Sequence, residues 1–124
     1  MAVEIGEEFG KDLKKGREAV RQAVAAFVVH LGEHGFVNLR GRNKPSWIIR
    51  RDDPKRDEKI AAAKRLHLHH YHIGPKYNAS HDGDTSEHVL HYQLLTMDDS
   101  EILVRIVDMS RHPPFKLPDQ KHLD

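Results

Sequence analysis

The chain has 124 residues, of which 38% are hydrophobic and 31% are charged, and its formal net charge is +1. This length fits one modest core, so we expect residues 1–124 to form a single domain. Cysteine is absent, which excludes disulfides, thiolate catalysis and cysteine zinc sites and fits a reducing compartment. The chain shows neither an apolar signal segment nor a run approaching the ~20 residues of a membrane span. We therefore expect a soluble, cytoplasmic protein without a membrane partner.

Residues 3–34 carry the pattern of an amphipathic helix. Apolar residues recur at spacings of three, four or seven, which places them on one helical face: Phe9, Leu13, Val20, Val24, Phe27 and Leu31. Gly16 interrupts the pattern, so this segment forms either two helices or one bent helix. Because an amphipathic helix needs a partner surface, we expect a helical layer that covers one face of a sheet.

The middle of the chain predicts short elements. Residues 36–39 fit a short extended piece, and the apolar run at 47–49 fits either a strand or a helical turn anchored in the core. Asp53 followed by Pro54 can open a helix, with the aspartate as its cap. A short helix is then expected to continue to Lys64.

The second half of the chain is strand-like. Three runs, at residues 66–73, 88–95 and 101–109, are separated by polar turns, which is typical of antiparallel strands. Together with the helical layer, they predict an α+β fold with a small three-stranded antiparallel meander.

Histidine is concentrated in this region, since seven of the eleven histidines lie between His67 and His91. Side chains alternate between the two faces along a strand. In the first strand, Leu66, Leu68, His70 and His72 alternate with His67, His69, Tyr71 and Ile73. In the second strand, Val89, His91, Gln93 and Leu95 alternate with His88, Leu90, Tyr92 and Leu94. Only some of these histidines can share one site, and the sheet register selects them.

Charge is unevenly distributed along the chain. Residues 40–76 hold eleven Lys or Arg against four Asp or Glu, whereas residues 77–100 hold five acids and no Lys or Arg. A local excess of this kind indicates either a solvated face or a surface that contacts phosphates.

The combination of His, Tyr and Arg on adjacent strands suits RNA cleavage without a metal or other cofactor. One histidine would remove the proton of the 2′-hydroxyl, and another would protonate the leaving 5′-oxygen. An arginine would stabilise the charge that develops on the phosphate. The residues predicted to be catalytic are His67, His69, His91, Arg105 and His112. Those predicted to contact RNA are Lys64, Arg65, Tyr71, Lys76, Tyr77, Tyr92 and Arg111.

Two alternatives remain open at this stage. His67 and His69 point to the same side of a strand, and with His88 or His91 they could chelate one metal ion. Alternatively, the domain binds RNA or protein without catalysis. The chain contains no phosphate-binding loop, zincin motif or nucleophile elbow that would favour another enzyme class.

The second half also resembles a known family. The residues that carry the likeness are Leu66-His67-Leu68-His69, the segment 85–92 and the segment 102–112. Following a helical N-terminal layer, this order resembles the YafO-like branch of the RelE/ParE toxin superfamily of bacterial toxin–antitoxin systems. The resemblance implies a RelE-like domain, in which helices pack on one face of a small curved antiparallel sheet. It also implies an mRNA endoribonuclease, in many members acting on the ribosome, that a cognate antitoxin protein holds inactive.

Carried over position by position, the resemblance points to His67, His69, His88 or His91 with Tyr92, and His112. The segment 88–92 is one residue longer than the family pattern. A bulge or register change there would decide which of His88 and His91 faces the site.

Overall fold

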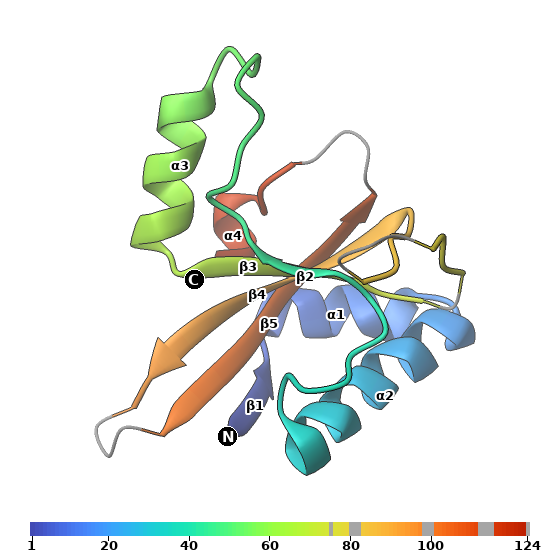
Figure 1. Ribbon diagram of the computed structural model, residues 1–124. Coiled ribbons are helices and arrows are strands. Elements are labelled where there is room, and N and C mark those ends of the chain that lie inside the picture. Colours follow the sequence, from blue (N-terminus) through green and yellow to red (C-terminus); the bar gives the residue numbers. More distant parts are fainter. Residues whose placement is uncertain (75, 80–82, 98–100, 112–115, 124) are drawn as a thin grey trace.

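The structure, a computed structural model, describes residues 1–74, 76–79, 83–97, 101–111 and 116–123. Within these residues the chain forms a five-stranded open sheet and four helices (Figure 1). The elements in chain order are β1 (Ala2–Ile5), α1 (Glu7–Lys15), α2 (Glu18–His34), β2 (Asn43–Pro45), α3 (Arg56–Arg65), β3 (Leu68–His72), β4 (His88–Thr96), β5 (Ile102–Arg111) and α4 (Gln120–Leu123). This mixture of helices and sheet is compatible with the predicted α+β class.

The N-terminal segment begins with a strand, where the sequence predicted a helix from residue 3. β1 pairs in parallel with β5, and the Gly6 N–H donates to the Ile106 carbonyl at 2.7 Å. Gly16 then separates α1 from α2, so of the two predicted alternatives the two-helix one is confirmed. The strand was missed because Ala-Val-Glu-Ile is too short to show a period, and only its pairing with β5 decides its structure.

The sheet has the strand order β1-β5-β4-β3-β2. β3, β4 and β5 form the predicted antiparallel meander. β2 pairs with the outer edge of β3, and β1 with that of β5. The predicted extended piece at 36–39 and the predicted strand or helical turn at 47–49 instead form turns and irregular structure.

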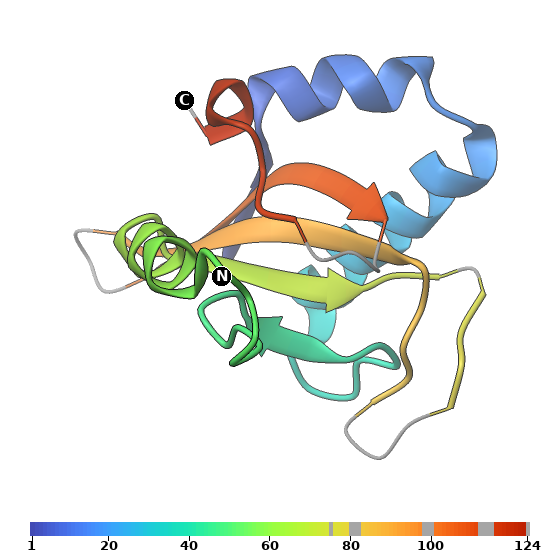
Figure 2. The ribbon, with the colours of Figure 1, turned by 90° about the horizontal axis from the view of Figure 1, so that it is seen from above.

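Helices cover both faces of the sheet, whereas the sequence predicted a single covered face. Figures 1 and 2 show α1 and α2 on one side of the sheet and α3 on the other. We term the two sides face A and face B. Face A packs against α1 and α2 through Tyr71, Ile73, Leu90, Tyr92, Val104 and Ile106. Face B packs against α3 and α4 through Leu68 and Val107, which contact Ala63 and Leu123.

The predicted third helix is confirmed, although it begins after the predicted cap. α3 starts at Arg56, and Asp53 organises the preceding turn. The Asp53 carboxylate accepts hydrogen bonds from the Lys55 N–H at 2.8 Å and from Lys59 Nζ at 2.5 Å. The side chain therefore links the turn to the helix without capping its first residue.

A β-bulge interrupts the pairing of β4 with β5. Tyr92 pairs with Ile106 and His91 pairs with Asp108, so Val107 has no partner on β4. The sequence indicated an irregularity near His91, and the structure places the extra residue on β5. Val107 packs on face B, opposite to its neighbour Ile106, and the bulge returns Met109 to face A.

Candidate active site

Three histidines lie side by side on face B. His70 and His72 belong to β3, and His91 belongs to β4, directly opposite His70. The ring centroid of His70 lies 5.9 Å from that of His72 and 6.4 Å from that of His91. All three are buried, with exposed fractions of 6%, 5% and 0% in the order His70, His72 and His91. We term these three side chains the histidine row.

Two members of the row contact serine hydroxyls. Ser46 Oγ lies 3.0 Å from His70 Nδ1, and Ser110 Oγ lies 2.7 Å from His91 Nε2. A hydroxyl can donate or accept, so it can serve an imidazole nitrogen in either protonation state. These contacts orient both rings.

The third member, His72, is oriented by backbone. The Ser86 N–H donates to His72 Nδ1 at 3.1 Å. The Ser86 carbonyl oxygen lies at the same distance, 3.1 Å, from this nitrogen, so the direction of the hydrogen bond depends on the tautomer of the ring. Both contacts come from the backbone of one residue, which fixes the orientation of the ring.

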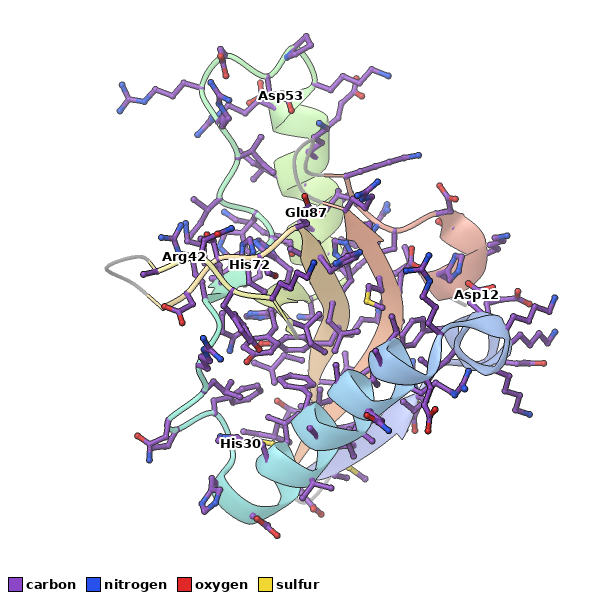
Figure 3. The ribbon with its side chains drawn as sticks, turned by 90° about the vertical axis from the view of Figure 1, so that its right-hand side faces the viewer. Asp12, His30, Arg42, Asp53, His72 and Glu87 are labelled. Carbon is purple, nitrogen blue, oxygen red and sulfur yellow. The ribbon has the colours of Figure 1, made fainter. Side chains whose placement is uncertain are left out.

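Strand β2 and the residue before it place two basic residues at the border of the row. Lys44 is opposite His70 in the ladder, and directly opposed residues project to the same face. The His72 N–H donates to the Arg42 carbonyl at 2.8 Å, and Figure 3 shows Arg42 beside His72. Both basic residues are half-buried. Face B thus combines imidazole side chains with cations, the kinds of group that acid–base chemistry at a phosphate uses.

His67 and His69, which the sequence placed at the catalytic site, do not join the row. His69 lies on face A, where its ring stacks on Tyr92 at 5.4 Å between centroids and meets the edge of Trp47 at 5.1 Å. His67 is exposed and precedes β3 with a φ of 55°. Burial lowers the pKa of His69, and the neighbouring His67 lowers it further. His69 therefore favours its neutral form more strongly than a free histidine does.

The lowered pKa of His69 predicts a loss of stability in acid. The unfolded state takes up this proton near the ordinary pKa of about 6.5, whereas the folded state resists it to lower pH. The contribution of His69 is thus present above about pH 6.5 and is lost as pH falls through its lowered folded-state pKa. We expect urea unfolding to show a smaller decrease in stability between about pH 7.5 and about pH 5.5 in His69→Gln than in the wild type. The exposed His34→Gln should behave like the wild type, and an unchanged pH dependence in His69→Gln would contradict the assignment.

The predicted arginines form ion pairs with acids outside the row. Arg105 Nε donates to Glu4 Oε1 at 2.5 Å across the β1–β5 pairing, and Arg111 Nη2 donates to Glu87 Oε2 at 3.3 Å at the end of β5. The structure therefore does not bring either guanidinium to the histidine row. His112 lies outside the described residues.

The predicted tyrosines lie in different environments. Tyr71 and Tyr92 are 4% and 1% exposed and pack beside Phe27, so neither ring offers a face to solvent. Burial raises the pKa of both hydroxyls well above its ordinary value. Tyr77 lies under the Arg40 guanidinium, 4.3 Å from the ring centroid, and lines a cavity of about 540 Å³ beside α2. The exposed members of the predicted RNA-contacting set are Lys64, Arg65, Lys76 and Arg111.

The register resolves the alternative between His88 and His91. His91 belongs to face B, opposite His70, whereas His88 alternates to face A with Leu90. His88 lines a second cavity, of about 280 Å³, between α1 and the end of β5. Of the two, only His91 is therefore in the histidine row.

Sequence reasoning missed four residues of this site: Arg42, Lys44, His70 and His72. Alternation had already grouped His70 with His72. The apolar residues next to the histidines could have shown that His91 lies on the same face as His70 and His72. If Tyr71 and Leu90 both face the core, the histidines next to them in the sequence must share the opposite face.

The same structure bears on metal binding and on membranes. Among the described residues, one group of three potential ligands comes together, formed by Asp12, Asp108 and His122, and it includes none of the strand histidines proposed as ligands. No described helix is long and apolar enough to cross a membrane.

Comparisons with protein-family models, with curated proteins and with solved structures found no match.

Proposed function

We propose that the protein is a toxin-type mRNA endoribonuclease of a bacterial toxin–antitoxin system, acting in the cytoplasm without a metal. The observation that carries this proposal is the histidine row bordered by Arg42 and Lys44. Imidazoles supply a base and an acid near neutral pH, and fixed cations stabilise phosphate charge. The arrangement is drawn from three adjacent strands, which makes it more rigid than a loop site.

The proposed reaction is an internal attack within RNA. The 2′-oxygen attacks the neighbouring phosphorus, and one histidine takes the 2′-hydroxyl proton. The bond from phosphorus to the 5′-oxygen breaks, and a second histidine gives that oxygen a proton. The products are a 2′,3′-cyclic phosphate and a 5′-hydroxyl. His70 and His91 suit the two proton transfers, because a centroid distance of 6.4 Å lets both rings reach oxygens of one phosphate.

Burial of the row sets a condition on substrate binding. RNA must open face B to reach the rings, and the half-buried Arg42 and Lys44 would make its first phosphate contacts there. Exposed cations of the basic segment, including Lys64 and Arg65 at the end of α3, would hold the flanking RNA. Binding of this kind weakens steeply as salt concentration rises.

The resemblance to YafO-like toxins supports a RelE-like fold and supplies the partners of this proposal. α1 and α2 precede the three antiparallel strands in the order on which the resemblance is based. The expected partners are an antitoxin, encoded by a small adjacent gene, and mRNA on the ribosome.

The test uses purified protein and a defined mRNA, with and without ribosomes, in excess EDTA. We expect cleavage at defined sites with new 5′-hydroxyl ends, and growth arrest when the protein is expressed in bacteria. Cleavage abolished by EDTA would favour a metal-dependent enzyme. RNA or protein binding with intact transcripts would favour a non-catalytic module, and normal growth would contradict the toxin proposal.

A further inference from the structure

A second group of chemically active side chains lies where α1, β5 and α4 meet. Asp12 comes from α1, Asp108 from β5 and His122 from α4, and Figure 3 shows Asp12 next to α4. His122 Nε2 lies 2.8 Å from Asp12 Oδ2 and 3.6 Å from Asp108 Oδ1. One ligand atom from each residue lies within 4.8 Å of the others. The group shares no residue with the histidine row.

The two carboxylates of this group share His122 as their ion-pair partner. His122 is 8% exposed and the Asp108 side chain is 18% exposed, whereas the Asp12 side chain is 55% exposed. Among the described ion pairs, His122 is the partner of both aspartates, and neither pairs with Lys or Arg. Burial raises the pKa of Asp108, while the hydrogen bond from His122 lowers the pKa of Asp12, helped by Lys121 and Lys15 nearby. A divalent cation would neutralise both carboxylates together.

The ligand set and its spacing suit zinc. One imidazole nitrogen and two carboxylate oxygens are ligands that Zn²⁺ accepts. Metal–ligand distances of about 2.0–2.2 Å in a tetrahedral site place ligand atoms roughly 3.4 Å apart. The observed separations of 2.8 and 3.6 Å from His122 Nε2 lie on either side of that value, so small side-chain rotations would complete the site.

The surroundings of the group also fit a metal site. The Met109 N–H donates to Asp108 Oδ1 at 2.8 Å, which fixes the carboxylate as an outer-shell partner does. The cavity of about 280 Å³ is lined by Asp12 and Asp108 and has room for a water as the fourth ligand.

We propose that Asp12, Asp108 and His122 bind a divalent transition-metal ion, for which Zn²⁺ fits best, and that the ion fastens α4 to α1 and β5. The ligands join the first helix of the chain to its last, so binding should stabilise the folded state by mass action. This site is independent of the proposed RNA cleavage, which needs no metal.

The test is Zn²⁺ binding to the full chain after treatment with EDTA. Calorimetry should show one site per chain that weakens roughly tenfold or more in Asp108→Asn and in His122→Gln. Zn²⁺ should also raise the melting temperature of the wild type and not that of either variant. Because eleven histidines offer other nitrogens, the exposed His34→Gln on α2 and Asp57→Asn on α3 serve as controls that should keep the wild-type affinity.

If His122→Gln unfolds α4, Asp108→Asn still tests whether the group binds Zn²⁺. Burial disfavours the charged form of Asp108, so the neutral amide of the same shape should leave the metal-free protein folded. The proposal is overturned if Zn²⁺ does not stabilise the wild type, or if folded Asp108→Asn binds Zn²⁺ as tightly. RNA cleavage in EDTA is a separate readout, so failure of this proposal can be told apart from failure of the proposed function.

Discussion

Replacing His91 by glutamine should lower the rate of RNA cleavage by roughly 10²- to 10⁴-fold, the usual contribution of one general acid or base. His91 is fully buried, and its Nε2 lies 2.7 Å from Ser110 Oγ. A glutamine amide can keep a hydrogen bond to this hydroxyl, but it does not exchange a proton near neutral pH. Single-turnover cleavage in EDTA measures the effect, and urea unfolding establishes that the variant is folded.

Matched variants separate a catalytic role of the row from a structural one. His70→Gln should reduce cleavage similarly, and the double variant should lose far less than the product of the two factors, because both groups serve one step. His34→Gln, on the exposed end of α2, should cleave like the wild type. Folded His70→Gln and His91→Gln proteins with wild-type rates would show that face B is not the active site.

Substitution of Gly41 by alanine should strongly destabilise the protein and displace the border of the row. A Cβ atom at this position would lie 1.8 Å from the His72 carbonyl oxygen and 2.8 Å from Tyr71 Cε1. The nearest of these is backbone of β3, so the residues leading into β2 would have to move away, with loss of the 3.1 Å hydrogen bond from the Gly41 N–H to the Tyr71 hydroxyl. We expect a loss of about 3 kcal/mol, the upper end for overpacking, in urea unfolding.

Gly32 provides the control for this substitution. It lies inside α2, and a Cβ atom there would meet nothing within 4 Å. Gly32→Ala should therefore stabilise the protein by about 0.5–1 kcal/mol through helix propensity. A Gly41→Ala protein as stable as the wild type would mean that the chain at residue 41 does not approach β3 as closely as the structure shows.

Much of the fold could be predicted because its patterns are local. The spacing from Phe9 to Leu31 predicted α1 and α2, and three runs separated by turns predicted the meander of β3, β4 and β5. β1 and β2 could not be predicted in this way. Ala2–Ile5 is too short to show a period, and Asn43–Pro45 lacks β-branched and aromatic residues. Both become strands because a free sheet edge offers them hydrogen bonds.

The candidate site could be predicted only in part. Alternation grouped His70 with His72, but the pairing of His70 with His91 depends on sheet register, which is a long-range property. The prediction chose His69 instead, and stacking on Tyr92 holds that ring on face A. The group around His122 had no sequence signal, because its three ligands come from separate elements that only the fold brings together.

The bulge at Val107 changes which residues of β5 face each side of the sheet. In an unbroken strand, even- and odd-numbered side chains would keep to opposite faces over the whole length, and Met109 would leave the core that Val104 and Ile106 enter. The extra residue at the bulge shifts the alternation by one position. Asp108 therefore pairs opposite His91, and its side chain reaches towards α4. Gain or loss of a single residue at this point would therefore turn the side chains of the downstream half of the strand to the opposite face while the upstream half stays packed.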